Sequence, residues 1–516
     1  MVERIRSLDA LAGLVAAAVA LGVAELAAGL LGRVSLVVSV GDLIVDTLPA
    51  PLVKLAIEVF GTYDKPALLV TIVAVSLGVG AMLGPAVARR PRVGVAAFVT
   101  FAVVGTLAGA SDTRTLGIVA ALIAGVGAWA GWRTLRWLLE AAEPSTVAAM
   151  PGRGVADRRR FLAFAGAASA GAVTAAVVGR RAGSPVDVEA QRTALVLPEV
   201  TASTPVEVPG LPVEGITPLV TPNDRFYRID TALVVPRVDV STWRLRVTGL
   251  VDAPFEITFD ELAEMATLNE AVTLVCVSNE VGGNLAGNAV WLGVPLTAIL
   301  GRAGVRREAT QIVGRSVDGF TVGFPTAVLA DGRPAMVAIG MNGEPLPADH
   351  GFPARLVVPG LYGYVSATKW LQEIELTTLE AFDAYWIPRG WAKEAPIKTQ
   401  SRIDVPRTGR AIVPGRRPIA GVAWGGIRSV SRVEVAIRPK VDGEYVAAEW
   451  REATLGEVLA QSTWRQWVLE WDAAPGEYEI AVRATDGEGN VQTEVESRPD
   501  PDGATGHHTI RVRVEA

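Results

Sequence analysis

Residues 273–284, TLVCVSNEVGGN, carry the strand and the turn around which the globular part of the chain is organised. The stretch opens with a short apolar run typical of a buried strand, and the polar, glycine-rich sequence behind it predicts a flexible loop. Upstream, residues 243–249 alternate apolar and polar positions and end in glycine, which predicts a half-buried strand. Thr258 begins a helical pattern as a capping residue. From about Ile216 the sequence therefore predicts a mixed α+β domain.

Cys276 is the only cysteine in 516 residues, and the chain has three histidines. A single cysteine excludes an intrachain disulfide, a four-cysteine zinc or iron–sulfur site, and the two-cysteine attachment of c-type haem. No haem is therefore expected, and three histidines leave little room for a histidine-rich metal site. The formal net charge is −6, and the acidic excess lies after residue 180. This acidity argues against nucleic acid as a partner.

Apolar runs dominate the first third of the chain. Five are long enough to cross a hydrocarbon core of ~30 Å as helices: residues 10–32, 66–88, 93–111, 115–132 and 161–179. Arginines gather on alternate sides of these runs, and the positive-inside rule then places the chain after Gly179 outside the cytoplasm. Residues 1–180 are thus predicted to be a multi-pass domain in the lipid bilayer of the cell membrane. The rest of the chain is expected on the extracytoplasmic side.

Several features of this part are less regular. Charged residues interrupt residues 34–62, which predicts two short amphipathic helices at the interface. Residues 158–160, three arginines before the last apolar run, resemble a twin-arginine export signal, although an ordinary cytoplasmic arginine cluster is an equal alternative. Glu25 is a functional candidate or, more simply, an interfacial carboxylate. Residues 181–215 hold five prolines and no aromatic residue, which predicts a linker.

After about Ser401 the helical pattern ends. Alternating apolar and polar positions recur at residues 432–437, 467–471, 478–483 and 509–514, separated by turns such as Asp442-Gly443. Such spacing predicts a β-sandwich of about a hundred residues. The predicted domains are therefore 1–180, 181–215, 216–398 and 399–516.

Three roles are open for Cys276 from its residue type and position. It could be a small buried hydrophobe, as most free cysteines are. It could be a nucleophilic thiolate with His350 as its base, in a Cys–His acyl-transfer enzyme. It could also be the single protein ligand of a metal whose other ligands come from an anionic organic cofactor, held by arginine, lysine and backbone donors.

The local sequences resemble the sulfite oxidase family of molybdopterin-dependent oxidoreductases, of the membrane-anchored bacterial type. Residues 221–227, TPNDRFY, are similar to the entrance motif of that family, and CVSN at 276–279 is followed by AVWLGVPL at 289–296. Residues 341–360, MNGEPLPADHGFPARLVVPG, match its most recognisable stretch and lead into YVSATKW at 364–370. Later segments resemble the immunoglobulin-like domain that follows in the family. The motifs run in order from about residue 216 to residue 516.

The resemblance implies a molybdenum–molybdopterin (Mo-molybdopterin) cofactor with Cys276 as the metal ligand. The residues implied to hold the cofactor are Asn223, Tyr227, Ser316, His350, Arg355, Ser366 and Lys369. The catalytic positions implied beside Cys276 are Arg225, Trp291, Arg389 and Arg428. By residue type, Arg355 offers a planar fork to a phosphate and Lys369 a point charge. A structural ion pair for Arg355 and a core position for His350 or Trp291 stay open.

The chain departs from the sulfite-oxidising members of the family at Glu280, where those members carry arginine. A carboxylate beside the metal would repel sulfite unless it points away. The function implied is extracytoplasmic oxygen-atom transfer on a small sulfur oxyanion or S-oxide. Its electrons would be exchanged with a separate carrier, a cytochrome or a membrane quinone.

Other functions are left open by the sequence. The reaction could run in reverse, as reduction of an S-oxide of the methionine sulfoxide type. The chain could instead be a non-catalytic, membrane-anchored envelope receptor, in which Cys276 would be dispensable. The C-terminal domain resembles the dimerisation module of the family, but the sequence does not decide whether the chain forms a homodimer.

Overall fold

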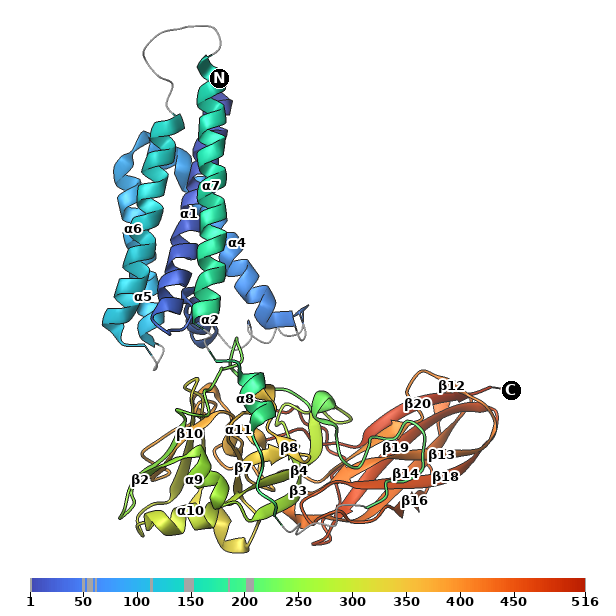
Figure 1. The fold of residues 1–516 in the computed structure, drawn as a ribbon. Coiled ribbons are helices and arrows are strands. Elements are labelled where there is room, and N and C mark those ends of the chain that lie inside the picture. Colours follow the sequence, from blue (N-terminus) through green and yellow to red (C-terminus); the bar gives the residue numbers. More distant parts are fainter. Residues whose placement is uncertain are drawn as a thin grey trace. The chain divides into compact units, whose positions relative to one another are not determined.

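The computed structural model describes residues 2–48, 52, 59–60, 63–111, 115–142, 153–183, 186–200 and 208–515. These residues form two compact units. One comprises Met1–Asp187 with Ala232–Arg237, and the other comprises Val188–Thr231 with Val238–Ala516. The first unit is helical, and the second is built mainly from strands (Figure 1).

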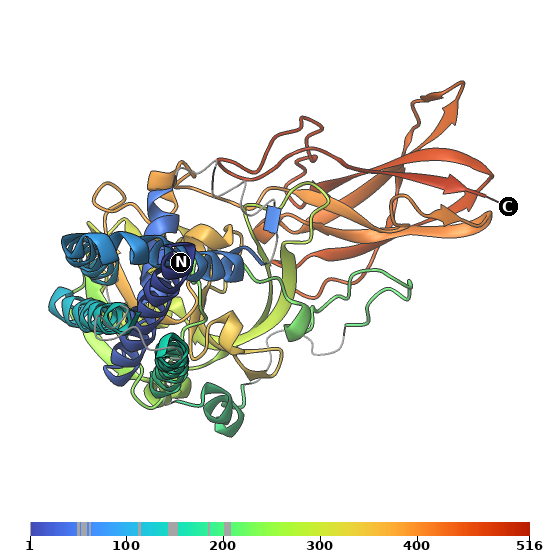
Figure 2. The same ribbon diagram turned by 90° about the horizontal axis from the view of Figure 1, so that it is seen from above.

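The first unit is a bundle arranged around its first helix. Its described helices are α1 (Val2–Leu30), α2 (Leu36–Thr47), α4 (Asp64–Arg89), α5 (Pro91–Ser111), α6 (Gly117–Ala142) and α7 (Arg153–Ala182). Helix α1 packs against α4, α6 and α7. Figure 2 shows the long helices of the bundle viewed roughly down their axes.

Small residues allow α1 to approach its neighbours closely. A Cβ atom built on Gly29 would lie 1.8 Å from the carbonyl oxygen of Gly179 in α7. A Cβ atom on Gly13 would lie 2.0 Å from the carbonyl oxygen of Gly80 in α4. Backbones in contact at glycine are typical of helices that pack inside a bilayer, where van der Waals contact replaces the hydrophobic effect.

Five described helices are long and apolar enough to cross a membrane. They are Ser7–Leu30, Asp64–Arg89, Pro91–Ser111, Gly117–Ala142 and Arg159–Ala182. They cover the five apolar runs recognised in the sequence. Helix α2 begins the segment predicted to hold two interfacial helices, and the Ser35 hydroxyl accepts a hydrogen bond from the Val38 amide at its start. Most of the second predicted helix, residues 49–51, 53–58 and 61–62, lies outside the described residues.

The second unit begins with two sheets. The first has the order β2-β1-β10-β5-β6, with β1 (Arg244–Gly249), β2 (Phe255–Thr258), β5 (Gln311–Ser316), β6 (Thr321–Pro325) and β10 (Leu371–Thr377). It is mixed, because β1 and β10 run parallel and its other pairs are antiparallel. The second has the order β3-β4-β7-β8, with β9 also on β7: β3 (Leu268–Val275), β4 (Ala286–Pro295), β7 (Met336–Met341), β8 (Glu344–Pro345) and β9 (Arg355–Val357).

Short helices connect these strands. They are α8 (Val188–Ala194), α9 (Phe259–Glu264), α10 (Leu296–Ala303) and α11 (Gly363–Ser366), with single turns η2 (Asn223–Arg225) and η4 (Ala348–His350). Thr258 caps α9 as predicted, in a reciprocal capping box with Glu261. Helix α8 lies inside the predicted linker. Its seven residues are too few to show a helical period in the sequence.

The C-terminal strands form two further sheets that share one core. Their strands are β11 (Gln400–Val405), β12 (Ala411–Ile412), β13 (Gly415–Trp424), β14 (Val430–Val441), β15 (Glu444–Tyr445), β16 (Trp450–Glu452), β17 (Thr454–Leu455), β18 (Arg465–Ala473), β19 (Gly476–Asp486) and β20 (His508–Val514). One sheet has the order β11-β13-β18-β17, and the other β12-β20-β19-β14-β15 with β16 on β14.

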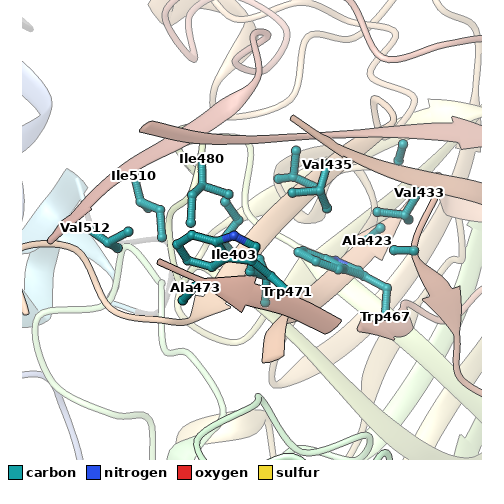
Figure 3. Packing of buried hydrophobic residues seen from close by; sticks show 14 of the residues in the cluster. Ile403, Ala423, Val433, Val435, Trp467, Trp471, Ala473, Ile480, Ile510 and Val512 are labelled. Atoms are coloured by element: carbon teal, nitrogen blue, oxygen red, sulfur yellow. The ribbon is translucent and has the colours of Figure 1, made fainter. Parts of the chain in front are cut away.

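Both C-terminal sheets contribute side chains to the core between them. Trp467 and Trp471 come from the first sheet, and Val435, Ile480 and Val512 come from the second (Figure 3). Trp467 is fully buried. This part of the chain is β-rich, as the alternating pattern predicted.

Candidate functional site

Cys276 lies directly after β3, at the start of a loop closed by its own backbone. The Cys276 amide donates to the Leu285 carbonyl oxygen at 2.9 Å, and the Asn279 amide donates to the Cys276 carbonyl oxygen at 3.0 Å. The Asn279 side-chain oxygen accepts from the Leu285 amide at 2.8 Å. The loop predicted from the glycine-rich sequence is therefore tightly turned, and it holds Cys276 buried.

The environment of the thiol disfavours a free nucleophile. Burial raises the pKa of the Cys276 thiol, against the opposite effect of hydrogen bonds from Ser278. A buried thiol with a raised pKa stays protonated, and binding a metal would displace that proton. Among the hydrogen bonds of the described residues, none joins Cys276 to His350, the base that an acyl-transfer enzyme would need.

Two tyrosines and helix α11 surround this thiol. Burial, and secondarily the nearby Cys276, raise the pKa of Tyr227. Burial also raises the pKa of Tyr362 to about 12. A Cβ atom on Gly363 would lie 3.8 Å from the Val275 carbonyl oxygen and 3.9 Å from the Tyr227 hydroxyl. The start of α11 therefore lies against the end of β3 and against Tyr227.

Arg355 is a buried cation that has no carboxylate partner among the described residues. It is 4% exposed, and its Nη1 donates to the His350 carbonyl oxygen at 3.0 Å. Its Nε is buried without a hydrogen-bond partner. The guanidinium lies 4.9 Å from the ring centre of Trp291 in β4, and burial lowers its pKa to about 10. An unpaired buried charge is costly, so this position fits an anionic group that arrives from outside the chain.

Lys369 is the second buried cation of the site. Its Nζ lies 2.8 Å from an oxygen of Asp230 and donates to the Asp349 carbonyl oxygen at 2.9 Å. Burial lowers the pKa of Lys369 to about 8 in spite of Asp230. Arg228 contacts the same Asp230 at 3.2 Å and Asp349 at 3.1 Å. Lys369 therefore belongs to a paired cluster, unlike Arg355.

His350 is neutral, and its tautomer follows from its partner. Its Nε2 lies 3.0 Å from the Asn223 carbonyl oxygen, which can only accept, so Nε2 carries the proton. Burial lowers the pKa of His350 to about 4, with a further contribution from Arg355. The other ring nitrogen, Nδ1, is therefore an acceptor. The structure brings Asn223, Tyr227, Trp291, His350, Arg355 and Lys369 into one connected region with Cys276.

Of the remaining predicted site residues, Ser366 belongs to α11 beside the thiol, whereas Ser316, Arg225, Arg389 and Arg428 lie in other surroundings. Ser316 ends β5 in the other sheet, where its hydroxyl accepts from the Asp318 amide. The Ser366 hydroxyl donates to the Tyr362 carbonyl oxygen. Arg225 and Arg389 are exposed, and Arg389 lies over the ring of Tyr385. Arg428 is engaged by Asp486, with Nε 2.7 Å from Oδ2.

The sequence did not point to the residues with which the C-terminal sheets hold the Cys276 loop. Arg402 donates from Nη1 to the Gly283 carbonyl oxygen at 2.7 Å and forms an ion pair with Asp404 at 2.8 Å. The ring of His508 lies against Gly282, where a Cβ atom would be 2.2 Å from Cδ2. The only signal in the sequence was the pair of glycines, which marks a close approach of backbone without naming the partner.

Part of the chain is similar to proteins of known activity. Residues 232–386 match the family model described as "Oxidoreductase molybdopterin binding domain". The chain is 31% identical over 321 residues to mitochondrial sulfite oxidase of Rattus norvegicus, covering 53% of this chain and 57% of that protein. It is 31% identical over 323 residues to nitrate reductase [NADH] of Solanum lycopersicum, covering 50% of this chain and 35% of that protein. The chain thus spans little more than half the length of this sulfite oxidase and about a third of the length of this nitrate reductase.

A solved structure has a similar fold to this chain over most of its own length. The sulfane dehydrogenase SoxCD of Paracoccus pantotrophus aligns with a TM-score of 0.50 at 22% sequence identity. The alignment covers 64% of this chain and 92% of the SoxCD chain. At this identity the likeness concerns the fold alone.

His508, a half-buried residue beside the Cys276 loop, predicts a pH dependence of stability. Burial lowers the pKa of His508 to about 4, and the ring is neutral in the fold, where Nδ1 accepts from the Ile403 amide. In the unfolded chain it would titrate near 6.5, so between about pH 6.5 and pH 4 the unfolded state binds the extra proton. Stability should therefore fall by about 3 kcal/mol as the pH drops through this window.

The measurement is the midpoint of thermal unfolding of the full-length protein between pH 7 and pH 4.5. We expect His508→Asn to flatten the pH profile, with the neighbouring His507→Asn as the control for loss of an imidazole. Equal slopes in wild-type protein and His508→Asn would contradict the assignment.

Proposed function

Because this chain belongs to the sulfite oxidase family of molybdopterin-dependent oxidoreductases, we propose that Cys276 ligates molybdenum and that the residues around it hold the pterin. The observation that carries this proposal is Arg355, a buried guanidinium with an unpartnered Nε and no carboxylate. The phosphate of a molybdopterin would supply the missing anion. When bound, the cofactor would supply a metal centre that takes up or gives two electrons as an oxygen atom is transferred.

The residues of the chain have separate tasks in this proposal. The planar fork of Arg355 suits a phosphate, and the Trp291 ring beneath it keeps the guanidinium in place. Lys369 adds a second positive charge, which Asp230 partly offsets. The Nδ1 atom of His350 would be the ring atom that accepts a hydrogen bond from a bound pterin, since Nε2–H is already engaged. Because Cys276 is buried, water would have little access to a metal bound at its sulfur.

The substrate is a small sulfur oxyanion or an S-oxide, with the electrons exchanged with a separate carrier, a cytochrome or a quinone. One observation favours the S-oxide, and with it the reductive direction. Arg428, expected to help bind an oxyanion, is paired with Asp486, and Arg225 and Arg389 are exposed. A neutral S-oxide does not require a free cationic pocket. The Glu280 side chain is exposed rather than directed into the core.

The membrane part of the proposal follows from the five candidate spans. If the arginines before the first span, between the second and third, and between the fourth and fifth face the cytoplasm, residues 188–516 lie outside it. The β-rich C-terminal part is proposed to be immunoglobulin-like, and the arginines at 158–160 to belong to a twin-arginine signal. The side chain of Arg158 lies outside the described residues.

The proposed metal site is tested by the composition of the purified protein. Full-length chain made in a host that synthesises molybdopterin should contain about one molybdenum per chain and show pterin fluorescence after release. Substitution of an outer-shell group at a metal site costs about 10–100-fold, so Cys276→Ser, which removes the ligand itself, should cost more than about 100-fold in activity. Well-folded wild-type protein without molybdenum and pterin would favour the envelope receptor instead.

The role of Arg355 is tested by opposite effects on stability and on pterin content. Arg355→Met removes a buried unpaired cation, so the cofactor-free protein should melt at the same or a higher temperature. Its pterin affinity should fall by about 30-fold or more, because the anion loses its buried partner. The control is Arg333→Met, since Arg333 is similarly buried but paired with Asp331 at 2.5 Å, and its loss should destabilise the protein. Full pterin content in Arg355→Met would contradict the role.

The orientation of the membrane part is tested with a reporter enzyme that is active only outside the cytoplasm. Fusion after Gly183 should give an active reporter, and fusion after Arg92 an inactive one, because the two points lie on opposite sides of the proposed topology. The reverse pattern would place the catalytic domain in the cytoplasm.

A further inference from the structure

Helix α8, which precedes the matched cofactor domain, is bound to that domain by polar side chains. Gln191 donates to Asp239 at 2.7 Å and accepts from the Val240 amide at 3.1 Å. Arg192 reaches the hairpin formed by β7 and β8, and Leu197 packs against Gly340 in β7. The segment after residue 188 is therefore part of the second unit rather than a free tether.

Arg192 is held in one position by two carboxylates. It contacts Glu189 in its own helix, with Nη2 to Oε1 at 2.8 Å, and Glu344 across the domain, with Nη1 to Oε2 at 3.0 Å. Nη1 also donates to the Pro345 carbonyl oxygen at 3.2 Å. The side chain of Arg192 is 18% exposed and that of Glu344 is 48% exposed, so the cation is shielded while its partner is open to solvent. Arg192 also lowers the pKa of Glu344, which keeps that carboxylate ionised.

The other oxygen of Glu344 holds Asn223. Nδ2 of Asn223 donates to Glu344 Oε1 at 2.6 Å and to the Met341 carbonyl oxygen at 3.2 Å. Oδ1 of Asn223 accepts from Nδ2 of Asn342 at 2.8 Å. Both amide hydrogens of Asn223 are thus engaged by the hairpin, which leaves its side chain no hydrogen to donate to a ligand.

The backbone of Asn223 in turn constrains the ring of His350. The Asn223 carbonyl oxygen receives the proton on His350 Nε2 at 3.0 Å and thereby fixes the tautomer of that ring. The contacts form one series, from Arg192 to Glu344, to Asn223 and to His350. Two members of this series, Arg192 and Asn223, lie outside the residues of the matched family model.

We propose that Arg192 and Glu344 are positioning residues, which lock the loop carrying Asn223 and so fix the ring of His350 toward the ligand. Asn223 then acts through its backbone and through the hairpin, and not by direct side-chain donation. The identity of the ligand rests on the proposed function, but the positioning of the loop does not. Helix α8 is thereby an integral part of the site.

The first test measures the loop itself. Hydrogen–deuterium exchange of the full-length protein in detergent should show roughly tenfold faster exchange of peptides covering residues 221–227 in Arg192→Ala, because a charge-assisted contact is lost. Arg246→Ala is the matched control, since Arg246 forms a 2.8 Å pair with Glu373 on the other sheet. Unchanged exchange of the loop in Arg192→Ala would overturn the proposal, with or without cofactor.

The second test exchanges the two partners. Asn223→Asp places a second carboxylate against Glu344 and should accelerate both exchange of the loop and release of bound pterin. Adding Glu344→Gln restores a donor–acceptor pair with the roles reversed, and should restore slow exchange and slow release. If Asn223 instead donated directly to the ligand, the double variant would stay as defective as Asn223→Asp, and this result would overturn the proposal.

The two tests separate the two proposals. If wild-type protein holds no pterin, the proposed function fails, while exchange of the loop still decides whether Arg192 positions it. If pterin is present and the exchange of residues 221–227 does not respond to Arg192→Ala, only the positioning role fails.

Discussion

The site depends on one buried guanidinium that the chain does not neutralise. Arg355 is enclosed between the Trp291 ring and the backbone of His350, with its Nε unpaired. Such a charge is destabilising in the folded chain alone, and its neighbours hold it in place without neutralising it. This explains why the surrounding polar groups, such as His350 and Lys369, already have partners of their own. An anion bound beside Arg355 would offset a cost that folding has already incurred.

The scaffold of this site is assembled from segments that are distant in the sequence. The Cys276 loop is held by Arg402 and His508 of the C-terminal sheets, and the Asn223 loop by the hairpin between β7 and β8. The turn of that hairpin uses Asn342 and Gly343, both at positive φ. Asparagine and glycine at such a turn fix the register of the two strands. The C-terminal sheets thus contribute to the site as well as to their own core.

The sequence predicted well those features that depend on local patterns. Long apolar runs, the cap at Thr258, and the strand that ends at Cys276 each follow from residue order within a short window. The family motifs also singled out Tyr227, Arg355 and Cys276, and the structure brings these three residues into one region. It could not distinguish Arg428, which an ion pair engages, from Arg355, which has none. That difference depends on which distant carboxylate reaches each guanidinium, and a local pattern holds no such information.

The close contacts of α1 set an order for the assembly of the bundle. Gly29 meets Gly179 backbone to backbone, and Gly22 also lies against the backbone of Ala172, so one face of the first helix is shaped for the last. Ribosomes make α1 first and α7 roughly 120 residues later, at a speed of about 5–20 residues per second. For that interval the small-residue face of α1 has no permanent neighbour. The contacts on this face of α1 can therefore form only after α7 has been made, at the moment when synthesis of the second unit begins.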